Sequence, residues 1–267
     1  MRVLMYEVPG NPHLSMAFEE AMWRELQRGK VPNTLRIWRH RSVAIVGYFQ
    51  MAEEELNFEK IREHKIDVLR RITGGGAVYQ DLGCLVWTIA VKGPKGGGIN
   101  YIYDFLLKGF VNTLKKFATV RVENINDVVV EHNGVGRKVS GTSATFRDEY
   151  YLLHGTLLVD TDLQILSSVL KVPRIKLADK GISEVKYRVT NLNDALGRRV
   201  NFDEIIDEMV KSYSELLGER PIYDIPTKDE LDLADELYRI KFSTPEWNLL
   251  RFPSSYFEKF RNLEKFK

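Results

Sequence analysis

Short stretches rich in β-branched and aromatic residues recur along the first part of the chain and predict strands. The segment 85–91 (LVWTIAV) is an apolar run of this kind. Gly134 and Gly136 suit a tight turn between the segments 127–132 and 136–146. The expected strands cover residues 2–8, 34–39, 42–48, 67–71, 85–91, 127–132, 136–146 and 150–159.

Helical periodicity appears near the start of the chain and dominates after residue 162. Ser15 is the expected N-cap of the first helix, and Gly29 stands where a glycine commonly ends one. The expected helices cover residues 16–28, 57–64, 101–117, 162–169, 202–216 and 227–240. The stretch 171–190 is polar and poorly periodic, which favours a mobile loop. The pattern predicts an α+β fold of mixed, largely antiparallel sheets with flanking helices, and not a doubly wound parallel sheet.

Composition narrows the function classes. The chain has 267 residues, of which 44% are hydrophobic, so it can bury a sizeable core. A formal net charge of +2 gives no reason to expect a nucleic-acid or membrane partner. Cys84 is the single cysteine, which excludes an internal disulfide and fits a reducing compartment. The N-terminus does not resemble a signal peptide, and we expect a cytoplasmic protein.

Arg70 and Arg71 precede three consecutive glycines, Gly74, Gly75 and Gly76. Bare glycine backbone lets N–H groups approach an anion closely, and an arginine adds a permanent positive charge. This pattern suits a phosphate or a carboxylate, although an ordinary glycine-rich turn is an equal alternative. The spacing matches neither the P-loop nor the dinucleotide-binding fingerprint. The second triplet, at residues 96–98, is typical of a flexible loop.

Three further polar residues stand in or beside predicted strands. Lys138 lies among glycines, where its compact charge could meet a phosphate or a developing oxyanion, unless it is simply a surface lysine. Asp127 begins a strand, where it could hold Mg²⁺ or cap a turn. His154 interrupts an apolar strand and is more often structural than catalytic in such a place. The five histidines and one cysteine show no zinc-ligand spacing.

Taken in order, these segments resemble the lipoate–protein ligase A family. Any single match is weak, but six in the right order are specific. The matching segments are Arg70–Gly83 (RRITGGGAVYQDLG), Asn126–Val129 (NDVV), Arg137–Ser143 (RKVSGTS), His154–Leu158 (HGTLL), Lys180–Leu192 (KGISEVKYRVTNL) and Phe242–Asn248 (FSTPEWN).

The resemblance implies a fold shared with biotin protein ligases and a reaction in two steps. Lipoate and Mg-ATP would form lipoyl-AMP, and a lysine of an acceptor protein would then take the lipoyl group. Lys138 would be the catalytic residue, touching both the lipoate carboxylate and the α-phosphate, and Asp127 would assist Mg²⁺. The residues that bind ATP or lipoate would be Arg71, Gly74, Gly75, Gly76, Ala77, Val78, Tyr79, Lys138 and His154. Residues around Val86 and Leu153 would line the tunnel for the dithiolane ring.

The sequence departs from the family pattern at three places. Gln80 replaces a histidine, and Cys84 replaces an asparagine. Many family members also continue into a second small domain, whereas here residues 1–248 form the expected catalytic domain and 249–267 a tail. The resemblance to bipartite ligases therefore implies a separate accessory polypeptide. The expected acceptors are lipoyl domains of 2-oxoacid dehydrogenase E2 subunits and the glycine-cleavage H protein.

Three other functions compete with this one. An octanoyl or lipoyl transferase that uses a carrier-bound or pre-activated acyl donor needs a nucleophilic cysteine, and only Cys84 is present. A biotin protein ligase shares the fold and the chemistry, but its biotin loop differs from residues 70–76. A non-catalytic binder of lipoylated proteins would not need Arg71, Asp127 and Lys138 together.

Overall fold

The fold is built on two sheets in a computed structural model that describes residues 1–132, 134–171 and 189–250. The large sheet contains, in spatial order, β11 (Ile222–Asp224), β1 (Arg2–Leu4), β2 (Thr34–Trp38), β6 (Cys84–Lys92), β10 (Tyr150–Leu158), β9 (Val135–Arg147), β8 (Asp127–His132) and β7 (Val120–Glu123). The small sheet contains β4 (Asp67–Arg70), β3 (Val43–Val46) and β5 (Val78–Gln80).

Most strand pairs are antiparallel. In the large sheet β1 pairs in parallel with β2 and β11, and every pair from β2 through to β7 is antiparallel. In the small sheet β3 is parallel to β4 and antiparallel to β5. The predicted fold class, mixed and largely antiparallel sheets with flanking helices, is therefore confirmed.

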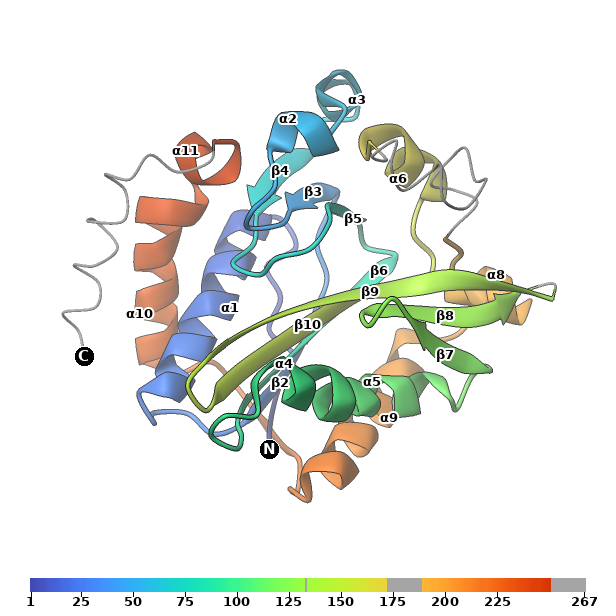
Figure 1. The fold of residues 1–267 in the computed structure, drawn as a ribbon. Helices are drawn as coiled ribbons and strands as arrows, with labels where there is room; N and C mark the ends of the chain where they lie inside the picture. Colours follow the sequence, from blue (N-terminus) through green and yellow to red (C-terminus); the bar gives the residue numbers. More distant parts are fainter. Residues whose placement is uncertain (133, 172–188, 251–267) are drawn as a thin grey trace.

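Helices cover both faces of the large sheet (Figure 1). Their bounds are α1 (Pro12–Gln27), α2 (Ala52–Glu55), α3 (Phe58–Glu63), α4 (Gly98–Asn100), the π-helical segment η1 (Tyr101–Leu106), α5 (Leu107–Leu114), α6 (Leu163–Val169), α8 (Leu192–Leu196), α9 (Phe202–Leu217), α10 (Lys228–Leu237), the π-helical segment η3 (Tyr238–Phe242) and α11 (Pro245–Asn248). Within the described ranges, none of these helices combines the length and apolar character that a bilayer crossing needs.

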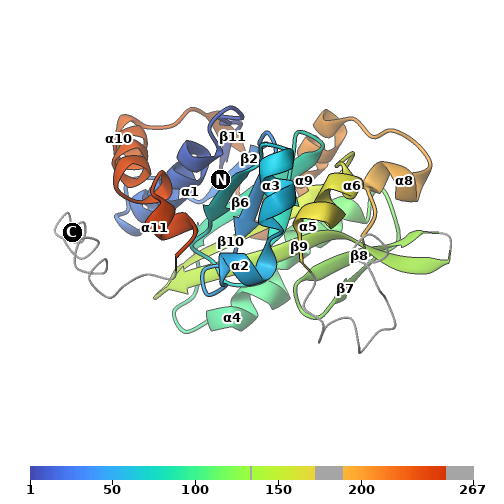
Figure 2. The ribbon, with the colours of Figure 1, turned by 90° about the horizontal axis from the view of Figure 1, so that it is seen from above.

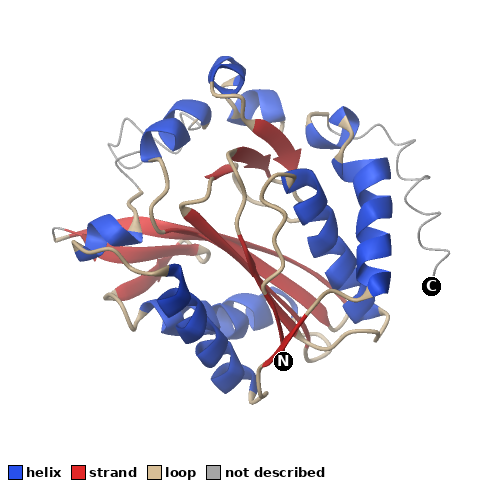
Figure 3. Cartoon of the chain, turned by 180° about the vertical axis from the view of Figure 1, so that it is seen from behind, coloured by secondary structure: helices blue, strands red, loops and turns tan. Residues whose placement is uncertain are grey.

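Strand β6 explains how one sheet supports two cores. Its odd-numbered residues from Leu85 to Val91, with Trp87 stacked on Phe110 of α5, belong to the core beneath α5 and α9. Its even-numbered residues face the other side, where Ala90 meets α1 and Val86 meets the small sheet. Figure 3 shows the long strands passing between the two groups of helices.

The small sheet stands above the second face of the large one. Helices α1 and α10 lie side by side along that face (Figure 1). Helices α3 and α6 lie together at the far end of the small sheet (Figure 2), where Leu56 and Leu170 form an isolated antiparallel bridge. The space between the two sheets contains a cavity, and the candidate site lies there.

One predicted helix boundary is wrong. Helix α1 begins at Pro12, and the side chain of Asn11 caps it by accepting from the backbone N–H of Leu14 at 3.0 Å. Ser15 lies inside the helix instead, and its hydroxyl accepts from buried Arg36 at 2.8 Å. Proline is favoured at the first helical position, which moves the start almost one turn earlier. Gly29 has the left-handed φ of +71° that the C-terminal prediction required.

Other predicted elements differ in length from those observed, and some observed elements were not predicted. Strand β1 ends at Leu4 rather than residue 8, and the predicted helix 101–117 is split into η1 and α5. The elements that the sequence did not predict are all short: α2, β5, α4, β7, α8, β11 and α11. Most of the loop predicted over 171–190 lies outside the described residues, as does the tail from residue 251.

Candidate functional site

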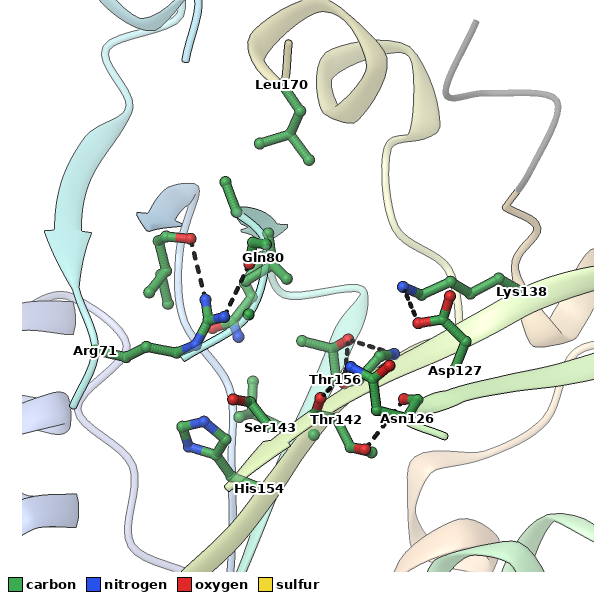
Figure 4. Close-up of a pocket in the computed structure, with 18 of the residues that line it drawn as sticks. Arg71, Gln80, Asn126, Asp127, Lys138, Thr142, Ser143, His154, Thr156 and Leu170 are labelled. Carbon is green, nitrogen blue, oxygen red and sulfur yellow. Dashed lines mark hydrogen bonds and ion pairs between the residues drawn. The ribbon is translucent and has the colours of Figure 1, made fainter. Parts of the chain in front are cut away.

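A cavity of about 410 Å³ lies between the two sheets (Figure 4). Among the residues predicted to act at the site, the structure brings eight to its wall, namely Arg71, Gly75, Gly76, Ala77, Val78, Asp127, Lys138 and His154. Gly74 and Tyr79 do not line it. Tyr79 is buried on β5, and its hydroxyl donates to the side chain of Ser42 at 3.1 Å.

The glycine loop between β4 and β5 is held from behind by Arg71. One guanidinium nitrogen, Nη2, donates to the carbonyl oxygens of Gly74 and Gly76 at 2.5 and 2.8 Å. Ser143 on β9 donates to the same Gly74 carbonyl at 2.7 Å. A trans peptide places N–H opposite C=O, so the amide groups of Gly75 and Ala77 point away from Arg71. The loop is thus arranged to present donors on its other side.

Arg71 is itself buried, with 6% of its surface exposed. Burial lowers its pKa to about 10, partly offset by the charge of Glu19. The guanidinium is still charged near neutral pH, so it supplies positive potential to the cavity wall as well as structure. Sequence reasoning expected a direct clamp on the ligand and did not foresee these contacts with the loop.

Close packing explains two of the glycines near this loop. Gly75 has a φ of +86°, which side-chain-bearing residues rarely adopt. Gly47, in the turn after β3, lies so close that an added Cβ would stand 2.0 Å from the Gly75 carbonyl oxygen. An added Cβ on Gly74 would meet only Phe49, at 3.8 Å.

Lys138 and Asp127 form an ion pair across the cavity from Arg71 (Figure 4). The Lys138 Nζ lies 2.6 Å from Asp127 Oδ1, and the two side chains are 32% and 14% exposed. An irregularity in the β8–β9 register between Val128 and Val129 places Lys138 opposite Val129, and so on the same face of the hairpin as Asp127. This pairing of a lysine and an acid on neighbouring strands was not visible in the sequence.

The backbone of Lys138 is fixed from the other side. Val189 forms a parallel bridge with it, and the N–H of Thr190 donates to its carbonyl at 2.9 Å. His132 Nδ1 lies 3.1 Å from the Thr190 hydroxyl. The segment after residue 188 therefore helps to hold the lysine on β9.

A strained turn borders the ion pair. Asn124 and Ile125, between β7 and β8, have φ angles of +50° and +73°, which are unusual for non-glycine residues and most unusual for isoleucine. Asn126 follows them and donates to the Thr142 carbonyl at 2.9 Å. Asn124 and Asn126 both line the cavity. Neither was a sequence-predicted site residue, although the Asn126–Asp127 pair was noted.

The oxygens beside Lys138 suit a hard cation. Asp127 supplies a carboxylate, and Asn124 and Asn126, which line the same cavity, have side-chain amide oxygens that are neutral ligands. Among the described residues no group of three His, Cys, Asp or Glu side chains is arranged to hold a metal ion by itself. Such a site would need further oxygens, as phosphate groups provide.

His154 contacts protein groups through both ring nitrogens. Its Nδ1 lies 2.9 Å from Glu19 Oε1 on α1, and its Nε2 lies 2.7 Å from the Thr73 hydroxyl. Burial alone would raise the pKa of Glu19, but His154, Thr88 and Arg36 outweigh it and the net pKa is lowered. Glu19 is therefore an ionised carboxylate with no exposed surface.

Another part of the wall is apolar. Met16, Trp38, Ile45 and Val86 line it. The Trp38 ring is fixed by the buried guanidinium of Arg36, 4.0 Å from its centroid, and by His40, which accepts from its indole N–H at 2.9 Å. Val86 lines the cavity as expected, but Leu153 belongs to the core beneath α5 and α9, so that part of the tunnel prediction is wrong. Strand alternation explains the error because residues next to His154 point the other way.

Gln80 at the end of β5 adds one polar group to this wall. Only 4% of the residue is exposed, and its Oε1 has no hydrogen-bond partner among the described residues. Because buried acceptors are normally satisfied, this oxygen is suited to a donor on a ligand.

Arg70 links the site to the last described helix. Its Nε donates to the Trp247 carbonyl at 2.9 Å, and its Nη1 donates to the carbonyls of Gly47 and Gln50 at 2.8 and 2.7 Å. In return the Trp247 indole donates to the Arg70 carbonyl at 2.7 Å. Asn248 Oδ1 accepts from the Arg70 N–H at 3.1 Å. The Glu-Trp-Asn segment thus holds the strand that leads into the glycine loop.

Cys84 is expected to be dispensable. It is fully buried beneath the small sheet, and burial raises the pKa of its thiol well above the usual range, which opposes formation of a nucleophilic thiolate. We expect Cys84→Ala to keep the wild-type rate of acyl transfer and to lose only about 1 kcal/mol of stability. Transfer assays and thermal melts of the purified variant would measure both. Complete loss of transfer by a folded variant would instead favour a transferase that uses this cysteine.

Comparisons of sequence agree with this geometry. The model of the lipoyl protein ligase A/B catalytic domain matches residues 11–214. Lipoate-protein ligase A subunit 1 of Thermoplasma acidophilum is 37% identical over 255 residues, which cover 93% of this chain and 96% of that protein. The octanoyltransferase LipM of Brevibacillus brevis is 29% identical over 269 residues, covering 90% and 96% of the two chains.

Comparisons of structure point the same way. The fold is similar to a bi-partite lipoate protein ligase from Thermoplasma acidophilum, studied with its E2 lipoyl domain, with a TM-score of 0.83, 35% identity and coverage of 95% and 97% of the two chains. A lipoate-protein ligase A bound with ATP gives a TM-score of 0.82, 32% identity and coverage of 94% and 99%. The chain therefore belongs to the lipoyl protein ligase A/B catalytic-domain family.

Proposed function

We propose that the chain is an ATP-dependent lipoate–protein ligase, which makes lipoyl-AMP and passes the lipoyl group to a lysine of an acceptor protein. One observation carries this proposal. A single cavity joins an apolar wall, formed around Trp38 and Val86, to a glycine loop whose Gly75 and Ala77 amides point away from Arg71 and to the Lys138–Asp127 pair. The apolar wall suits an alkyl chain, and the polar groups suit the carboxylate that ends this chain together with a nucleotide phosphate.

In the first step a lipoate carboxylate oxygen attacks the α-phosphorus of ATP and pyrophosphate leaves. Two anions must approach each other, and Lys138 is placed to neutralise both. The amides of Gly75 and Ala77 would donate to the phosphates, and Gln80 would accept from a hydroxyl or amino group of the nucleoside. Arg71 would contribute by ordering the loop and by its charge.

Magnesium would bind beside Lys138. Asp127 would supply one carboxylate oxygen, the phosphates would supply others, and Mg²⁺ would neutralise charge on the leaving pyrophosphate. The ion pair between Asp127 and Lys138 keeps both side chains at the point where the charges of the two substrates meet.

In the second step the amine of an acceptor lysine attacks the acyl carbon of lipoyl-AMP. An amide bond forms, the bond to the phosphate oxygen breaks, AMP leaves, and the amine gives up a proton. We propose lipoyl domains of E2 subunits as the first acceptors and the glycine-cleavage H protein as a further one. We also propose that a separate small polypeptide assists, because the Thermoplasma acidophilum relative is named as a subunit and its structure is of a bi-partite ligase.

The test is formation of lipoyl-AMP from lipoate and Mg-ATP, followed by transfer to an E2 lipoyl domain. The purified chain would be assayed alone and with the second component of the Thermoplasma acidophilum ligase. Adenylate and transfer by the chain alone would establish a self-sufficient ligase. Activity only with the added component would establish a bipartite one. Absence of adenylate in both mixtures, with transfer from an octanoyl carrier protein, would replace the proposal with a transferase.

A further inference from the structure

Thr73 connects the glycine loop to buried groups on two other elements. It is 1% exposed and stands immediately before Gly74. Its hydroxyl oxygen accepts from Arg71 Nε at 3.0 Å and lies 2.7 Å from His154 Nε2. Its carbonyl accepts from the N–H of Tyr48 at 2.8 Å. No other residue of the loop makes hydrogen bonds to both Arg71 and His154 in the described part of the chain.

With His154 neutral, one arrangement of the hydrogens satisfies every contact in this chain. Glu19 is an ionised acceptor, so the His154 Nδ1 that faces it carries a hydrogen. The opposite nitrogen, Nε2, is then an acceptor, and the Thr73 hydroxyl donates to it. That leaves the lone pairs of the hydroxyl for the Arg71 N–H, and Arg71 in turn donates to Gly74 and Gly76.

We propose that Thr73 is a positioning residue for adenylation. It connects the fixed Glu19–His154 pair to Arg71 and thereby aligns the amides of Gly75 and Ala77 for the nucleotide. The inference rests on the proposed function for its ligand, although the ordering of the loop does not. Thr73 is absent from the cavity wall, so it acts through other groups. His154 lines the wall but has both nitrogens engaged, so it also serves chiefly to position.

The contact between Thr73 and Arg71 affects substrate binding. The hydrogen bond from Arg71 Nε to Thr73 sets the plane of the guanidinium. Arg71 Nη2 donates to the two loop carbonyls. Loss of the Thr73 hydroxyl leaves a buried N–H and a buried histidine nitrogen without partners. The guanidinium is then free to turn toward other acceptors, and the loop amides lose their common orientation. Binding of ATP is affected more than the folding of the sheets.

The experiment compares Thr73→Val, which keeps the shape, with Thr73→Ser, which keeps the hydroxyl. Thr113→Val is the matched control, because Thr113 is equally buried and its hydroxyl donates to the Gly109 carbonyl far from the site, on α5. Steady-state adenylation with varied ATP and varied lipoate is measured for each. Amide hydrogen exchange of the segment 74–77 is measured in each protein without a ligand.

Thr73→Val is expected to raise the KM for ATP by about tenfold or more, the loss typical of a hydrogen bond to a charged group, and to speed exchange at the loop. Thr73→Ser is expected to restore both values, and Thr113→Val to leave both unchanged. A merely structural role would lower kcat through the folded fraction while KM and loop exchange stayed constant. That result would overturn the proposal. If the wild-type chain makes no adenylate but Thr73→Val still loosens the loop, the proposed function fails while the positioning role stands.

Discussion

Replacing Lys138 with alanine is expected to reduce the rate of lipoyl-AMP formation by about 10²- to 10³-fold, the usual cost of losing one group that stabilises developing charge. The Nζ of Lys138 lies 2.6 Å from Asp127 Oδ1, and Lys138 is the only lysine or arginine of the described residues of β8 and β9 that lines the cavity. Because the pair is partly exposed, its loss should change the free energy of unfolding by no more than about 1 kcal/mol. Pyrophosphate release and thermal melts measure the two effects.

The control for this variant is Lys92→Ala. Lys92 stands at the end of β6 and is also ion-paired, with Glu149 at 2.9 Å, but it is 58% exposed and does not line the cavity. It should keep wild-type activity. If a folded Lys138→Ala protein turned over at the wild-type rate, the catalytic role of Lys138 would be wrong even if the chain is a ligase.

Replacing Gly47 with alanine should disable the glycine loop from outside it. The added Cβ would stand 2.0 Å from the Gly75 carbonyl oxygen and 3.2 Å from Arg71 Nη2, so backbone must move. Overpacking of this kind typically costs about 1–3 kcal/mol of stability, and here it also displaces the carbonyls that Arg71 holds. We expect ATP binding to weaken strongly, which titration of ATP against the purified variant would measure.

Gly74→Ala is the matched control because it adds the same methyl group to the loop itself. At Gly74 the new Cβ meets only Phe49, at 3.8 Å, and the φ angle is not left-handed. This variant should fold and bind ATP nearly as the wild type does. Equal loss of binding by both variants would mean that the ligand, rather than the contact with Gly47, requires a bare backbone here.

The sequence predicted those parts of the fold that depend on local pattern. The apolar run 85–91 became β6, and the long periodic segments became α1, α9 and α10. The elements that were missed have only three to five residues, and such short elements depend on the partner against which they pack. β5 pairs with β3, and α11 accepts a hydrogen bond from Arg70 of β4 at its Trp247 carbonyl.

The candidate site likewise contains residues that the sequence predicted and partners that it did not. Glycine spacing pointed to a loop, and position in a family-like order pointed to Lys138, Asp127 and Arg71. Their partners could not be read from the chain, because the contact between His154 and Glu19 spans 135 residues and that between His154 and Thr73 spans 81. The pairing of β6 with β10 brings Thr88 opposite His154, and both side chains bind Glu19 of α1.

The contact between Arg70 and α11 also bears on the order in which the protein is made. Arg70 is bound by Trp247 and Asn248, which follow it by 177 and 178 residues. Contacts of such separation in sequence form late, and the N-terminal part of a nascent chain leaves the ribosome first. The strand before the glycine loop consequently has no support on that side until nearly all of the described chain has been synthesised. A partly made chain could form its large sheet and still lack an ordered nucleotide loop, so competence to consume ATP would arise only after residues 247 and 248 have been synthesised.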